Sequence, residues 1–175
     1  VRAYHAAGFS GLVLTDHFVL GSTAVDRSLP WAEQMKCYWQ AYQDAKQVGD
    51  ELDFDVIFGI EHAYGDGKEI LFYGIDLDFL LANPDIPEIP LEEFVARVHN
   101  YGGIAVQAHP YRCRWYVNME VGPRTDLIDG AEVHNVWNQP GEDAKALAMA
   151  KEGGFLMTCG GDIHLASDAK LGTAG

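Results

Sequence analysis

The stretch that decides the fold of this chain is Gly8–His17, which reads GFSGLVLTDH. A short apolar run bounded by glycines is typical of a buried β-strand, and this run ends on Asp16 and His17. A carboxylate and an imidazole are both common metal ligands. Because structural histidines are also common, the stretch becomes informative only if the same pattern recurs elsewhere in the chain.

The pattern does recur along the chain. Further apolar runs lead to Glu61-His62, His109-Pro110, Glu132-Val133-His134-Asn135 and Asp162-Ile163-His164. Another strand is expected over Glu69–Ile75, and helices are expected after Pro30, over Pro90–Tyr101 and over Pro140–Glu152. Alternating strands and helices predict parallel βα units that close, or nearly close, into a barrel. The site of such a barrel lies at the carboxyl ends of its strands, where all these polar residues fall.

The composition describes one globular domain spanning residues 1–175. The chain is 48% hydrophobic, and its net charge of −14 disfavours binding to nucleic acid or to an anionic membrane. Its three cysteines show no CxxC spacing, which disfavours a disulfide framework. No apolar run approaches the roughly 20 residues of a membrane span, and no signal-peptide pattern is present. We therefore expect a cytoplasmic protein that acts away from membranes.

The side chains at the strand ends are expected to hold metal ions. Because residues two apart on a strand share a face, Glu132 and His134 should point the same way. The adjacent Asp16 and His17 cannot both point inward from a regular strand, so we expect His17 to be a ligand and Asp16 to orient a neighbour. Mixed imidazole and carboxylate ligands suit Zn²⁺, Mn²⁺ or Fe²⁺. A carboxylate such as Glu61 can bridge two such ions.

Taken in order, these strand ends resemble the PHP (polymerase and histidinol phosphatase) domain. The resemblance covers nearly the whole chain and is carried by Thr15-Asp16-His17, Gly59-Ile60-Glu61, Ala108-His109-Pro110, Glu132 with Asn135, and Gly161-Asp162-Ile163-His164. It implies an α/β fold, a distorted TIM-like (β/α)7 barrel. It also implies that this barrel holds two or three divalent metal ions and hydrolyses phosphoesters.

The resemblance further implies a role for each ligand. Glu61 would bridge two metal ions, with His109 bound to one ion of the pair and Asp162 to the other. His17 and His164 would share a third ion. Glu69 aligns best with a position at which the family usually has a ligand histidine, so it joins the expected metal ligands.

Both ends of the chain look cut relative to the family pattern. Val1–Gly8 reads as the last turns of a helix, and Gly175 follows closely on a loop of the expected site. The family's opening strand, with its His-x-His pair, would precede Val1. We therefore expect a truncated domain, incomplete at both ends, that binds metal weakly without the upstream segment.

Arginines are concentrated in the loop that follows His109. Three of the chain's 12 basic residues lie there: Arg112, Arg114 and Arg124. A guanidinium beside a metal cluster can clamp a phosphate, and Arg112 is the expected substrate-binding residue because the family often has a basic residue just after its His-Pro. In the same loop, Trp115 either packs against the loop or stacks on an aromatic group of a substrate.

These features predict a metal-dependent phosphoesterase. It would hydrolyse a small phosphomonoester or nucleotide by attack of a metal-bound hydroxide, with Asp16 and His134 as the catalytic residues that manage protons. Among nucleic acids, only nucleotides or short oligonucleotide ends are expected as substrates. The sequence does not indicate an oligomeric state.

Two other functions stay open. A catalytically silent PHP module with a structural or binding role would suit Glu69 and the missing opening strand, and a His-x-His pair upstream would argue against it. A metal-dependent hydrolase of C–N bonds would share the barrel but should carry a metal-bridging lysine at a strand end. No lysine lies near the predicted strand ends.

Overall fold

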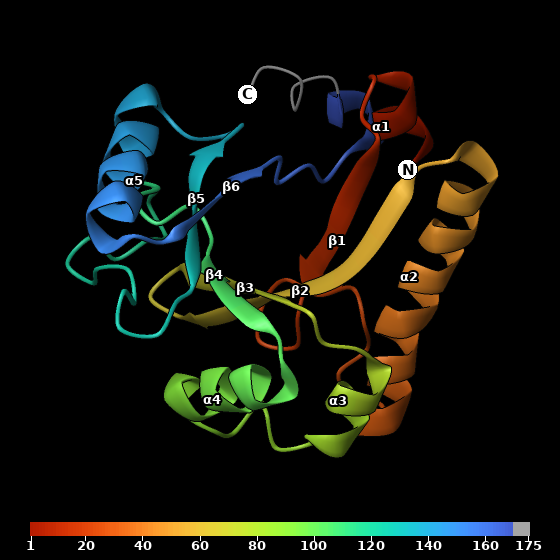
Figure 1. The fold of residues 1–175 in the computed structure, drawn as a ribbon. Coiled ribbons are helices and arrows are strands. Elements are labelled where there is room, and N and C mark those ends of the chain that lie inside the picture. The colour runs from red at the N-terminus through yellow and green to blue at the C-terminus, as the bar shows by residue number, and fades with distance from the viewer. Residues whose placement is uncertain (170–175) are drawn as a thin grey trace.

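The computed structural model describes residues 1–169 as a curled sheet with helices on its outer side (Figure 1). Its strands are β1 (Gly11–His17), β2 (Asp55–Gly65), β3 (Lys68–Tyr73), β4 (Ile104–Gln107), β5 (Gly130–Asn135) and β6 (Leu156–Gly160). Its helices are α1 (Arg2–Ala6), α2 (Trp31–Leu52), α3 (Leu77–Ala82), α4 (Leu91–Tyr101) and α5 (Pro140–Gly153). The helices α2, α4 and α5 pack on β2, β4 and β5 respectively. Within residues 1–169, no helix combines the length and the apolar character that a membrane span requires.

The six strands follow chain order across the sheet, but they do not all run parallel. The pairs β1–β2, β4–β5 and β5–β6 are parallel, whereas β3 runs antiparallel to both β2 and β4. The expected purely parallel arrangement is therefore wrong, because the tight turn at Asp66-Gly67 joins β2 directly to β3 and leaves no crossover helix. In residues 1–169, β1 and β6 each have one neighbouring strand, so the sheet forms an open half-barrel, a partial TIM-like arrangement (Figure 1).

Alternation along β2 separates the hydrophobic core from the concave side of the sheet. Phe58, Ile60 and His62 are buried in the core, at 8%, 1% and 4% exposure. Ile57 and Glu61 instead line a cavity on the concave side. Because successive strand residues face opposite sides of a sheet, Glu61 and His62 point apart.

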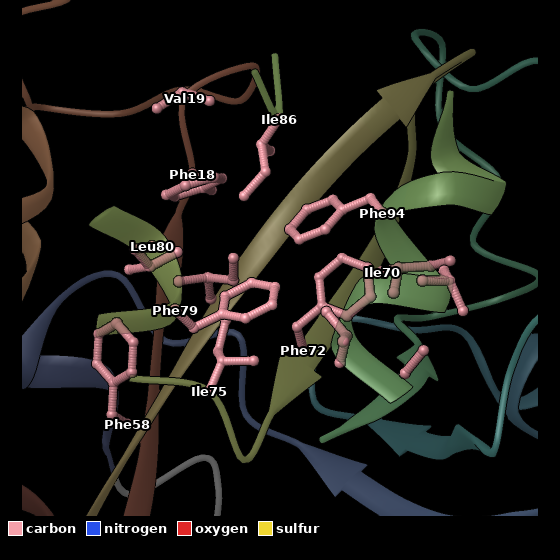
Figure 2. Close-up of a cluster of buried hydrophobic side chains, with 14 of the residues drawn as sticks. Phe18, Val19, Phe58, Ile70, Phe72, Ile75, Phe79, Leu80, Ile86 and Phe94 are labelled. Carbon is pink, nitrogen blue, oxygen red and sulfur yellow. The ribbon is translucent and has the colours of Figure 1, made fainter. Parts of the chain in front are cut away.

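The main hydrophobic cluster fills the space between the sheet and the helices α2, α3 and α4 (Figure 2). The rings of Phe72 and Phe94 are fully buried and lie 4.3 Å apart. His62 packs edge-on against Phe94 at 4.9 Å, and burial lowers its pKa to about 4, so it is a neutral core residue. Met35 and Tyr38 of α2 complete this side of the cluster.

The helix α3 was not predicted from the sequence. It begins after Asp76, whose carboxylate accepts a hydrogen bond from the backbone N–H of Phe79 at 3.0 Å. This is an ordinary N-cap contact. Phe79 and Leu80 then close the edge of the core. A helix of six residues is too short to show a clear apolar period in the sequence.

Replacing Phe72 by alanine should lower the free energy of unfolding by about 3–5 kcal/mol, since it leaves a cavity in a close-packed aromatic cluster. Chemical denaturation measures this loss. Met119→Ala, at a surface position that is 47% exposed, is the control and should change stability by less than about 0.5 kcal/mol. Equal losses in the two variants would contradict the placement of Phe72 at the centre of the core.

Candidate metal centre

The concave side of the sheet holds a cavity of about 1030 Å³. Its walls come from β1, β2, β3, β5 and β6 and from the segments that follow β4 and β6. The predicted site residues that line it are Asp16, His17, Glu61, His109, His134, Asp162 and His164. The structure thus brings the polar strand ends together around one cavity.

Two imidazoles and two carboxylates meet beside this cavity. His17 Nδ1 lies 2.7 Å from Glu61 Oε2 and 3.5 Å from Glu69 Oε1. His109 Nε2 lies 3.2 Å from Glu69 Oε2 and 3.5 Å from Glu61 Oε1. Each carboxylate therefore spans the two imidazoles with its two oxygens. One ligand atom from each of His17, Glu61 and Glu69 lies within 4.8 Å of the other two, close enough to share an ion.

The register of the sheet produces this cluster. His17 is paired with Glu61 across β1 and β2, and Glu61 is paired with Leu71 across β2 and β3. Glu69 stands two residues before Leu71 and so shares its face of β3. His109 follows β4, the next strand of the sheet. The four side chains come from three adjacent strands and the segment after a fourth.

The unpaired nitrogens of this cluster fit a divalent cation. His17 Nδ1 and His109 Nε2 are buried and make no hydrogen bond, although carboxylate oxygens lie at ion-pair distance. Buried polar atoms without a partner are rare and call for an explanation. Nitrogen and oxygen atoms that crowd together without hydrogen bonding to one another are arranged like ligands around an ion, and this donor set suits Zn²⁺, Mn²⁺ or Fe²⁺.

The crowded charges shift the pKa values of the cluster. Burial raises the pKa of the Glu61 carboxyl, but His109 and His17 lower it by more, so that the net pKa is about 2. Burial lowers the pKa of His109, but the Glu61 and Glu69 carboxylates raise it to about 9. The Glu61 carboxylate likewise raises the pKa of His17 against the effect of burial. Without a bound metal ion, protons on the imidazoles therefore neutralise the negative charge of the carboxylates.

His164, in the segment after β6, lies beside His17 at the cavity. Their Nε2 atoms lie 3.3 Å apart. Two nitrogens bound to one tetrahedral ion at about 2.0–2.1 Å would be about 3.3 Å apart, so this pair fits a shared ion as an alternative to an ion at His17 Nδ1, because a neutral imidazole has one lone pair. Asp16 precedes His17 on the cavity wall, and burial raises the pKa of its carboxyl.

Arg112 holds Asp162 in place. Its Nη1 donates to Asp162 Oδ2 at 2.6 Å, Nη2 to Asn135 Oδ1 at 2.6 Å, and Nε to Asn138 Oδ1 at 3.1 Å. Arg112 is only 6% exposed, so it does not merely solvate an exposed loop. Three of the five N–H donors of a guanidinium are used in this way, which leaves two without an acceptor among residues 1–169.

The backbone is strained at two residues of the site. His109 has a φ of 28° and Asp162 a φ of 46°, in the left-handed region that residues other than glycine rarely adopt. Such strain persists only where the surroundings hold it, and it is concentrated at functional sites. The contacts of Asp162 with Arg112 and of His109 with Glu132 supply that hold.

Glu132 holds the backbone of His109 beside the cluster. Its Oε2 accepts hydrogen bonds from the backbone N–H of His109 at 2.9 Å and from Asn135 Nδ2 at 3.1 Å. Burial raises the pKa of this carboxyl. Its other oxygen lies against Gly160, where an added Cβ would stand 1.8 Å from Oε1. Glu132 therefore fixes the strained backbone of His109. Its side chain fits there only because position 160 is a glycine.

His134 has a different partner from Glu132. The pairing of β5 with β6 shifts register between these two residues, which interrupts the expected alternation. His134 Nδ1 lies 2.6 Å from Asp143 Oδ2 on α5, while its Nε2 is buried without a hydrogen bond. Asp143 was not among the residues predicted from the sequence. The available signal was an acidic residue in the first turn of the helix that follows the strand.

Solved structures of similar fold cover almost the whole chain. One from Bifidobacterium adolescentis, provisionally named a metal-dependent phosphoesterase, has a TM-score of 0.65 at 16% identity and spans 95% of this chain and 81% of its own. An amidohydrolase from Chromobacterium violaceum, with bound sulfate and no metal, has a TM-score of 0.66 at 16% identity and spans 93% of this chain and 80% of its own.

A third similar structure is a two-domain protein from Bacteroides vulgatus that contains a predicted PHP-like metal-dependent phosphoesterase. It has a TM-score of 0.63 at 13% identity, and the match spans 93% of this chain and 46% of that protein. No protein-family model matches the chain, and no curated protein matches it either. At these identities the likeness shows the fold, a partial TIM-like α/β fold shared with proteins named as hydrolases.

Replacing Gly160 by alanine should displace the Glu132 carboxylate and release the backbone of His109. We expect the free energy of unfolding to fall by about 1–3 kcal/mol, as for a buried polar group that loses its partner, together with weaker metal binding. Denaturation and metal titration measure the two effects. Gly122→Ala, where a Cβ meets nothing within 4 Å, is the matched control. A Gly160→Ala protein that behaves like this control would contradict the role given to Glu132.

Metal binding should be coupled to loss of protons from the imidazoles. Because the pKa of His109 is raised from 6.5 to about 9, the apparent affinity for Mn²⁺ should increase with pH between about 6.5 and 9. In the metal-free protein the free energy of unfolding should change in the opposite direction. His109 binds its proton more tightly in the folded than in the unfolded chain, so the stability that this proton contributes is lost as pH rises through that range. Chelator competition and denaturation at a series of pH values measure these slopes.

His109→Gln should flatten both slopes and His5→Gln should leave them unchanged; equal slopes in the two variants would contradict the assignment.

Proposed function

We propose that this protein is a metal-dependent phosphoesterase that hydrolyses a small phosphomonoester or nucleotide. The observation that carries the proposal is the pair of carboxylates, Glu61 and Glu69, each spanning two imidazoles whose facing nitrogens are buried without hydrogen bonds. The names of the similar B. adolescentis and B. vulgatus structures support phosphoester chemistry. The sulfate in the C. violaceum structure, an anion shaped like phosphate, agrees with it.

The proposed metal ligands line the cavity, except for Glu69, which lies beside it in contact with His17 and His109. They are His17, Glu61, Glu69, His109, Asp162 and His164. Two or three divalent ions held there would supply Lewis-acid activation of water and neutralise charge on the phosphoryl oxygens. The protein's contribution is to bring these ligands together through the strand register and the network around Arg112.

Three further residues act on the substrate in this proposal. Arg112 binds a phosphoryl oxygen with the N–H groups that its protein partners leave free, while it keeps Asp162 in position. Asp16 is one proton-transfer residue, because burial raises its pKa toward the range in which a carboxyl can hold a proton. His134 is the second, with its ring oriented by Asp143.

We also propose that residues 1–175 form one domain of the PHP type, part of a distorted (β/α)7 barrel. The open half-barrel and the order of the polar strand ends support this assignment. So does the coverage of more than nine-tenths of this chain by each of the three similar structures.

A second candidate function is metal-dependent hydrolysis of an amide, which the name of the C. violaceum protein favours. The cavity wall described in residues 1–169 contains no lysine that could bridge two metal ions. A phosphoesterase is therefore the better match for this donor set. Parallel assays with a phosphomonoester and an amide panel separate the two activities.

Removal of metal should abolish hydrolysis of p-nitrophenyl phosphate, and Mn²⁺ or Zn²⁺ should restore it. Glu61→Gln should lower metal content and reduce kcat/KM by at least about 100-fold, since it removes a charge shared by both imidazoles. Glu152→Gln, on the exposed side of α5, is the matched control. Elemental analysis and steady-state kinetics are the measurements. Full activity in chelator, or in the Glu61→Gln variant, would overturn the proposal.

A further inference from the structure

All three polar groups of Trp137 form hydrogen bonds within the protein, and these bonds hold the residue in place. Its backbone N–H donates to Asn135 Oδ1 at 3.1 Å, and its backbone carbonyl accepts a hydrogen bond from Arg114. Its indole Nε1 donates to the backbone carbonyl of Asp162 at 2.8 Å. With these three groups used inside the protein, Trp137 can offer a ligand only its aromatic surface.

The contacts of Trp137 place it at the edge of the candidate metal centre. Asp162, which its indole touches, lines the cavity, and so does Val136, which precedes Trp137 in the chain. Asn135 Oδ1 accepts from both Trp137 and Arg112, so the tryptophan belongs to the network that holds Asp162. Despite these anchors, Trp137 remains 43% exposed.

A large aromatic side chain that is both immobilised and half exposed is well suited to ligand binding. Little conformational entropy remains to be lost when a second ring stacks on it. Stacking of a base on an aromatic side chain contributes about 5- to 150-fold in affinity.

We propose that Trp137 is a specificity-determining residue, whose indole stacks on a planar aromatic ring that the substrate carries near its phosphate group. The site then prefers phosphoesters that contain a base-sized ring over those that lack it. This inference rests on the proposed phosphoesterase function and narrows its substrate class. The roles proposed above for the metal ligands and for Arg112 do not require the substrate to carry an aromatic ring.

The other exposed tryptophan near this face has a different setting. Trp115 is 96% exposed and does not pack against its loop, so the expectation that it packs there is wrong. Its ring contacts only that of Tyr116, edge-on at 5.6 Å, among the described aromatic pairs. Within residues 1–169, no hydrogen bond holds the Trp115 indole as the carbonyl of Asp162 holds that of Trp137. Trp115 therefore provides a matched control for removal of an exposed indole.

A purely positioning role for Trp137 makes a different prediction. If the indole served only to hold the carbonyl of Asp162, loss of its N–H would weaken all ligands of the site alike. Trp137→Phe removes that N–H but keeps a ring, whereas Trp137→Leu removes both. The two variants therefore separate stacking from positioning.

The test uses two phosphonate ligands, in which a CH₂ group replaces the bridging oxygen so that neither is hydrolysed. They are the analogues of AMP and of ribose 5-phosphate, which differ only in the base. Calorimetry on the Mn²⁺-loaded full chain gives Kd for each, and kcat/KM for AMP and ribose 5-phosphate gives an independent ratio. We expect the wild-type protein to prefer the adenine-containing member by at least about fivefold.

Trp137→Leu should remove most of this preference, because it weakens the adenine analogue more than the ribose analogue. Trp137→Phe loses the same N–H but keeps a ring, so it should affect the ribose analogue equally and keep part of the preference. Trp115→Leu should leave the preference unchanged. Equal binding of both analogues by the wild-type protein, or equal weakening of both in Trp137→Leu and Trp137→Phe, overturns the inference but not the proposed function. Failure to bind either phosphonate, together with no hydrolysis of any phosphomonoester, overturns both.

Discussion

The sharing of the Glu61 carboxylate between His17 and His109 is the interaction on which the rest of this structure depends. Its two oxygens face two imidazoles, one on β1 and one just after β4, and the combined charges lower its pKa to about 2 while raising that of His109 to about 9. Such a cluster is costly without a compensating charge. Protons provide that charge in the metal-free protein, and divalent ions provide it in the function that we propose. Metal binding and protonation are therefore alternatives at the same atoms.

A second network, around Arg112, keeps the far side of the site in place. It joins Asp162, Asn135 and Asn138, which lie after β6, at the end of β5 and before α5. Because a buried charge pair that loses one partner leaves the other uncompensated, these loops cannot move independently at small cost. Trp137 shares the network through Asn135 and Asp162. The same contacts that position a candidate metal ligand therefore also fix the surface on which we expect a substrate ring to stack.

Much of the site could be predicted from the sequence, because strand ends in an α/β protein meet at one rim. The apolar runs before His17, Glu61, His109 and Asp162 carried that information, and the structure places all four residues at one cavity. The antiparallel direction of β3 was not predicted, since a strand pattern does not specify direction. The separate partners of Glu132 and His134 were not predicted either, because a shift of strand register leaves no clear trace in a single sequence.

By itself, the sequence determined which side chains were available and, where a strand is regular, which face they occupy, because a period of two is a local property of the chain. Only the tertiary structure decided which of them meet. It brought Glu69 to His109, Asp143 to His134 and Trp137 to Asp162, over separations in the chain that no local pattern links. These contacts depend on how strands and loops pack against one another. Packing is set by the whole chain at once.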